Sequence, residues 1–239
     1  MTSPRLSLAQ TAGYGIGNTG LALVNIVVQT WLLYFLAPPV GRTLIPASLA
    51  GTIWLIGRIA DAAADPLVST WSDRTRSRAG RRLPFLLASA LPLAGVCFLL
   101  FVDSIYAGPL ALPAGVLALL LGLYYILFTV YAVPFNSLVA DLGRAGADRV
   151  RLSTSAAIYN LIGTAGAAVA AGLLIGAFAK DEGAVAGAVT GAAGAVSEAV
   201  AAFDASAFPP AMAILMAIAA ITFLGTPIAP WKQRSRGAT

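Results

Sequence analysis

The stretch LPAGVLALLLGLYYILFTVYAVPFNSLVA, residues 112–140, decides which kind of fold this chain can adopt. It contains no charged residue, and a helix needs roughly 20 apolar residues to cross a hydrocarbon core about 30 Å thick. The whole chain agrees: of its 239 residues, 59% are hydrophobic and 10% are charged, against roughly 45–50% apolar and about 25% charged residues in soluble domains. We therefore predict an integral membrane protein.

Five further apolar stretches lie on either side of residues 112–140, at 12–36, 46–71, 83–102, 153–178 and 207–229. None has the two-residue alternation that is typical of a membrane barrel. We predict an all-α membrane protein with six transmembrane helices that form a single domain over residues 1–239. The stretch 181–206 is either another span or an external loop. Its glycines and flanking acids favour the loop.

The positive charges predict an orientation. Of the 15 lysines and arginines, 12 lie at the ends of the spans that share one side of the membrane, and only Arg42 and Lys180 lie on the other. Arg58 is inside a span. Because positive residues are retained on the cytoplasmic side, both termini are expected in the cytoplasm. The net charge of +5 thus reflects topology and contact with anionic membrane lipid, so nucleic acid is not expected as a partner.

The composition also limits the chemistry. The chain has no histidine and one cysteine, Cys97. Histidine general-base catalysis, zinc–imidazole and haem–histidine sites and an intrachain disulfide are therefore excluded. We expect neither an enzyme nor a bound cofactor. The beginning of the chain, MTSPRLSLAQ, lacks a short apolar core followed by a cleavage site, so no removable signal peptide is expected.

Three ionisable residues lie within the second predicted span, in GRIADAAADP, residues 57–66. Arg58, Asp61 and Asp65 are spaced i, i+3 and i+7, which places them on one helix face. Two neighbouring carboxylates repel unless a cation lies between them or one is protonated. The pattern predicts a Na⁺ or H⁺ site at Asp61 and Asp65, with Arg58 tuning its charge, most simply by neutralising Asp61. The alternative is that Arg58 and Asp61 only join helices while Asp65 faces water.

Two other groups of polar residues have open interpretations. The cytoplasmic loop 73–82 is either an anchor for lipid phosphates or a gate built from ion pairs of Asp73, Arg74, Arg81 and Arg82. Amides, hydroxyls and phenols within the spans either line a substrate cavity or form hydrogen bonds between helices. The cavity candidates are Asn18, Asn25, Gln29, Tyr131, Asn136, Tyr159 and Asn160.

The segments GRIADAAADPLVSTWSDRTRSRAGRRLPF (57–85) and YAVPFNSLVADL (131–142) resemble the glycoside–pentoside–hexuronide:cation symporters of the major facilitator superfamily. The resemblance to the sodium-coupled melibiose permeases implies a cation site at Asp61, Asp65 and Thr129. Ala64 stands where those proteins have an asparagine. Their sugar-site carboxylates correspond to Ala22 and Ala132 here, and their helix 5 arginine would fall near residues 155–157, where none occurs.

Members of this family have twelve helices in two halves, so the resemblance implies that this chain is one half of such a bundle. It is then expected to pair with itself as a homodimer or with a separately encoded second half. We expect a cation-coupled secondary transporter in the bacterial inner (plasma) membrane, moving a small or amphipathic, sugar-like or lipid-like solute by alternating access. The alternative is a non-transporting scaffold or accessory subunit with the same fold.

Overall fold

The computed structural model describes residues 8–38, 43–75, 82–143, 146–178 and 207–225. All regular secondary structure in these residues is helical, which confirms the predicted all-α class. The helices are α1 (Leu8–Ile26), the π-helix η1 (Val27–Trp31), α2 (Leu32–Leu36), α3 (Ala47–Arg74), α4 (Leu83–Leu99), the 3₁₀ helix η2 (Asp103–Tyr106), α5 (Ala111–Leu142), α6 (Gly146–Phe178) and α9 (Phe208–Gly225).

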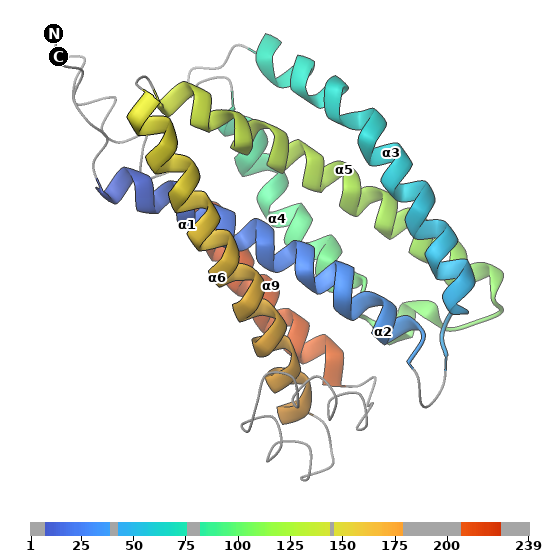
Figure 1. The fold of residues 1–239 in the computed structure, drawn as a ribbon. Helices are drawn as coiled ribbons and strands as arrows, with labels where there is room; N and C mark the ends of the chain where they lie inside the picture. The colour runs from blue at the N-terminus through green and yellow to red at the C-terminus, as the bar shows by residue number, and fades with distance from the viewer. Residues whose placement is uncertain (1–7, 39–42, 76–81, 144–145, 179–206, 226–239) are drawn as a thin grey trace, which may run out of the picture.

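The long helices pack as a bundle in which α3 occupies an edge (Figure 1). α1 packs against α6 and α9, while α5 packs against α3 and α4, and α4 also contacts α9. α3 is attached to the rest of the bundle mainly through α5. One face of α3 therefore carries large exposed apolar side chains, including Leu55, Ile59, Leu67 and Trp71.

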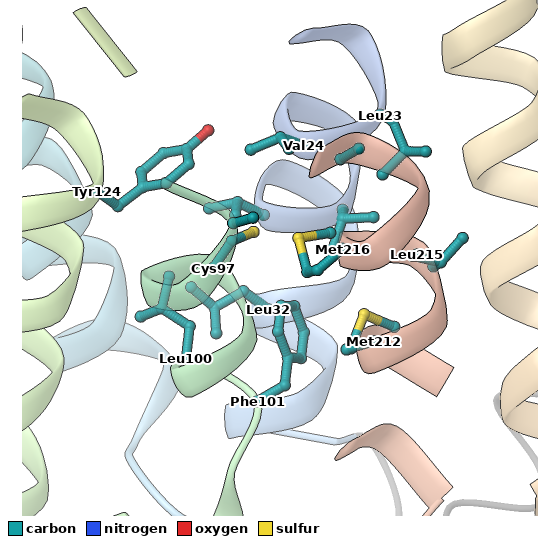
Figure 2. Close-up of a cluster of buried hydrophobic side chains, with 14 of the residues drawn as sticks. Leu23, Val24, Leu32, Cys97, Leu100, Phe101, Tyr124, Met212, Leu215 and Met216 are labelled. Atoms are coloured by element: carbon teal, nitrogen blue, oxygen red, sulfur yellow. The ribbon is translucent and has the colours of Figure 1, made fainter. Parts of the chain in front are cut away.

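The core lies where α1, α2, α4 and α9 meet. Figure 2 shows Cys97, Leu100 and Phe101, at and just after the end of α4, near Leu32 of α2 and the two methionines of α9. Figure 2 also shows Tyr124 of α5 entering the cluster from the opposite side. In the same cluster, the Phe101 ring stacks on the Phe208 ring, with centroids 6.2 Å apart. These buried aromatic and branched side chains fill the space between helices and make the bundle a close-packed unit.

Three helical stretches are long and apolar enough to cross a membrane: Thr11–Leu36, Ala111–Ala140 and Gly146–Phe178. Two shorter apolar helices, Leu83–Leu99 and Phe208–Leu224, accompany them. α3, which contains Arg58, Asp61 and Asp65, is not among the five. These helices indicate that the chain is a membrane protein. The number of six spans and the orientation of the termini remain predictions.

The helix limits differ from the predicted spans by a few residues at several ends, and most at the start of α6. α6 begins at Gly146, before the predicted residue 153, and its first turn contains Asp148, an acid that the helix dipole stabilises at an N-terminus. α3 continues through Pro66 to Arg74, although a proline removes one backbone hydrogen bond. The Thr70 hydroxyl donates to the Pro66 carbonyl oxygen at 2.8 Å. The stretch 181–206, predicted as a loop, lies outside the described residues.

Candidate cation site

α3 and α5 meet through a hydrogen bond between two of the predicted cation ligands. The Thr129 hydroxyl of α5 donates to Oδ1 of Asp61 in α3. Thr129 is buried and Asp61 is half-buried. A hydroxyl oxygen and a carboxylate oxygen from different helices are thus held side by side, and each could be one of the several oxygen ligands that a hard cation such as Na⁺ takes.

Asp65, the third predicted ligand, lies one helical turn beyond Asp61 and is exposed. Within the described part of the chain, no hydrogen bond or ion pair involves its carboxylate. Those same residues contain no group of three His, Cys, Asp or Glu side chains close enough to hold a metal ion. The structure therefore brings Asp61 and Thr129 together and leaves Asp65 facing outward on the same helix.

Arg58 contacts an aromatic ring. Its guanidinium carbon lies 5.7 Å from the centroid of the Tyr125 ring on α5, within the distance at which a cation is attracted to a ring face. Among the described residues, Arg58 forms no ion pair with Asp61. The direct neutralisation of Asp61 by Arg58 that the spacing suggested is thus absent from this conformation.

Tyr125 can occupy this position because residue 57 is glycine. A Cβ atom at Gly57 would lie 2.6 Å from Cε2 and 2.8 Å from Cδ2 of Tyr125, closer than real carbon atoms approach. Tyr125 is 2% exposed, so its ring cannot simply move into solvent. Neither Gly57 nor Tyr125 was predicted as a site residue, although Tyr125 precedes Thr129 by four positions and so shares its helix face.

Three buried polar atoms lie near this site: Nε2 of Gln29 and the hydroxyls of Tyr124 and Tyr125. The side chains of Gln29 and Trp54 lie within hydrogen-bonding range of the Tyr125 side chain. Gln29 belongs to the π-helix η1, a distortion that often occurs at functional positions. Gln29 was predicted as a cavity residue, and in the structure its side chain lies beside Tyr125. The two tyrosines extend the polar surface of α5 by one turn from Thr129.

Asn18 and Tyr159, two other cavity candidates, instead join α1 to α6. The Asn18 amide donates to the Ala156 carbonyl at 2.6 Å, and Thr19 donates to the Tyr159 carbonyl at 3.0 Å. The Tyr159 ring fills the space beside Gly15. Of the two interpretations, hydrogen bonding between helices describes Asn18 in this structure.

The remaining cavity candidates are dispersed. Tyr131 is buried between Phe135 and Phe223, with centroids 5.8 and 4.4 Å away. Asn136 and Asn160 are exposed, and Asn25 is half-buried.

The melibiose permeases have charged sugar-site residues at positions that correspond here to Ala22 and to residues 155–157. Both positions lie in the α1–α6 interface. Ala22 is buried on α1, and a Cβ atom at Gly163 of α6 would lie 2.9 Å from its Cβ. The Ser155 hydroxyl of α6 donates to the Thr11 carbonyl at 2.9 Å. These positions contribute to helix packing, which requires small side chains where two helices approach closely.

Within the described residues, the predicted gate includes an ion pair at the junction of α3 and α4. Nη2 of Arg82 lies 3.8 Å from Oδ1 of Asp73, with Arg82 buried and Asp73 exposed. Trp71 and Phe85 pack edge-to-face next to it, 5.3 Å apart. Arg74 is exposed, and Arg81 lies outside the described residues.

The chain matches the family model described as MFS/sugar transport protein over residues 13–238, and it belongs to this family. It is 42% identical over 94 residues to an uncharacterized symporter of Synechocystis, covering 39% of this chain and 17% of that protein. It is 37% identical over 101 residues to the inner membrane symporter YicJ of Escherichia coli, covering 42% and 21%. It is 28% identical over 157 residues to the isoprimeverose transporter of Lactiplantibacillus pentosus, covering 65% and 31%.

The matched region thus spans less than a third of the length of each of these relatives. The matches confirm the resemblance to the glycoside–pentoside–hexuronide:cation symporters and place the chain among transport proteins, not among enzymes. Together with the apolar helices, they identify an integral membrane protein.

Proposed function

We propose that this chain supplies the ion-coupling part of a cation-coupled secondary transporter, with Asp61, Asp65 and Thr129 as ligands of Na⁺ or H⁺. The observation that carries the proposal is the hydrogen bond from Thr129 to Asp61 between α3 and α5. An ionisable residue within a membrane bundle is costly. Asp61 is therefore best explained by an ion that it binds and releases. No cofactor besides this ion takes part.

The solute is a small or amphipathic molecule, sugar-like or lipid-like. The family description and the name of the isoprimeverose transporter favour a sugar-like solute. The packed α1–α6 interface around Ala22 and Gly163 leaves no carboxylate to hold it there. Recognition therefore depends on neutral groups, of which Gln29 is the best candidate because its amide lies beside Tyr125, next to the ion site.

The complete transporter places this bundle in the inner (plasma) membrane with both termini in the cytoplasm. A homodimer or a separately encoded second half completes the transport path, because facilitator transporters bind their solutes between two halves. The Arg82–Asp73 ion pair at the end of α3 serves as part of a cytoplasmic gate.

The test is the thermal unfolding of the purified protein in detergent, with Na⁺ replaced by choline at constant ionic strength. A ligand that binds only the folded state stabilises it by RT ln(1 + [L]/Kd), or roughly 2.7 kcal/mol at about 100-fold saturation. We expect saturable stabilisation by Na⁺ in the wild type and its loss in Asp61→Asn, which keeps the size of the side chain.

A second arm covers proton coupling. If Na⁺ has no effect, the unfolding temperature is measured across pH, and a transition that is missing in Asp61→Asn identifies H⁺ as the ion. If the wild type and Asp61→Asn respond identically to both ions, the chain has no coupling site at Asp61. A non-transporting subunit then becomes the better description.

A further inference from the structure

Tyr125 is an unusual neighbour for an ion-binding site, because its buried ring is inserted against the backbone of α3. The insertion needs Gly57, where a Cβ atom would lie 2.6 Å from the ring. One turn further along α5, Thr129 holds Asp61. Both side chains of α5 thus contact the same helical turn of α3. Tyr125 lies beside Gly57 and Arg58, and Thr129 contacts Asp61.

Arg58 has two available partners. Asp61 lies three residues further along the same helix, a spacing at which opposite charges pair readily. The ring of Tyr125 lies across the interface with α5. In the structure Arg58 lies over the ring, 5.7 Å from its centroid, and forms no ion pair among the described residues. The Asp61 carboxylate instead accepts the hydrogen bond from Thr129.

The choice of partner matters for the proposed ion site. An arginine paired with Asp61 would neutralise the carboxylate and compete with any cation for it. An arginine held over a ring keeps its charge nearby but leaves the Asp61 carboxylate without an ion-pair partner among the described residues. Tyr124, the adjacent tyrosine, is equally buried, but no cation lies over its ring in the described part of the molecule.

We propose that Tyr125 is a positioning residue for the coupling ion: it holds Arg58 by a cation–π contact and so keeps Asp61 available. This inference rests on the proposed function, since it requires an ion at Asp61. It also assigns a role to Gly57, whose lack of a side chain admits the ring. Loss of the ring transfers Arg58 to Asp61, and the ion then binds only by displacing the guanidinium.

The test measures the half-saturating Na⁺ concentration, from thermal unfolding, in Tyr125→Phe and Tyr125→Leu. The Tyr125→Phe variant keeps the ring face, and we expect it to bind Na⁺ with the affinity of the wild type. Leucine removes the ring, and we expect the half-saturating concentration to rise about two- to fivefold, the size of a cation–π contact made by an exposed arginine. A general packing defect would lower the unfolding temperature without Na⁺ and would leave the half-saturating concentration unchanged.

A double-mutant cycle with Arg58→Gln separates positioning from packing. If Tyr125 acts only through Arg58, Tyr125→Leu changes the Na⁺ dependence in the wild type and not in the Arg58→Gln background. An equal loss of affinity in both backgrounds would overturn the inference, as would wild-type affinity in Tyr125→Leu. If the wild type responds to pH instead of Na⁺, the same variants are compared by their Asp61-dependent pH transition.

The two hypotheses fail differently. If neither Na⁺ nor pH gives a response that depends on Asp61, the proposed function is wrong and the role of Tyr125 is wrong with it. If Asp61 binds an ion and Tyr125→Leu leaves that binding unchanged, only the inference about Tyr125 is overturned.

Discussion

At the scale of one residue, Gly57 illustrates how a missing side chain positions another residue. Alanine normally favours a helix over glycine by about 1 kcal/mol, yet a Cβ atom here would meet the Tyr125 ring at 2.6 Å. We expect Gly57→Ala to lower stability by about 1–3 kcal/mol, the usual cost of overpacking, in a thermal unfolding scan. The control is Gly51→Ala on the same helix, where nothing lies within 4 Å. Equal unfolding temperatures for both variants would contradict the close contact.

At the scale of the elements, α1 and α6 are held together by close approach and by hydrogen bonds from side chain to backbone. A Cβ atom at Gly163 would lie 2.7 Å from the carbonyl oxygen of Thr19. Because a backbone atom cannot rotate away, Gly163→Ala is expected to destabilise the protein by about 1–3 kcal/mol. Gly166→Ala, on an open part of the same helix, should have little effect. A smaller loss of stability at Gly163 than at Gly166 would show that the helices lie further apart.

At the scale of the whole molecule, the single cysteine makes the orientation measurable. Cys97 is fully buried, so the wild type should not react with a membrane-impermeant maleimide. Ser104 and Ala147 are exposed near opposite ends of the bundle. With cytoplasmic termini, we expect Ser104→Cys to be labelled in intact cells and Ala147→Cys only after the membrane is opened. The reverse pattern would invert the predicted topology, and labelling of the wild type would show that Cys97 is accessible.

Much of the fold follows from local properties of the sequence. The long apolar stretches predicted the helices because a bilayer admits backbone only when its polar groups are bonded internally. The start of α6 was predicted too late in the sequence. Its first turn is charged, and hydropathy alone cannot predict that a helix extends beyond its apolar part. The membrane class and the family were likewise predictable from composition and from the segment 57–85.

The candidate site was predictable only in part. The spacing of Arg58, Asp61 and Asp65 placed them on one face, and the resemblance added Thr129, which contacts Asp61 in the structure. The partner of Arg58 and the role of Asn18 could not be predicted. Both depend on atoms of other helices, and helical periodicity does not report which faces of two helices meet.

The sequence by itself thus determined the helical membrane fold, the family and the acidic helix that carries the candidate ion ligands. Each follows from hydrophobicity, charge or motif along a single segment. The tertiary structure alone decided that Arg58 lies over Tyr125, that Gly57 makes room for that ring and that Asn18 joins α1 to α6. The physical reason is that these contacts depend on the crossing of helices far apart in the chain, where a difference of one methyl group determines how closely two backbones approach.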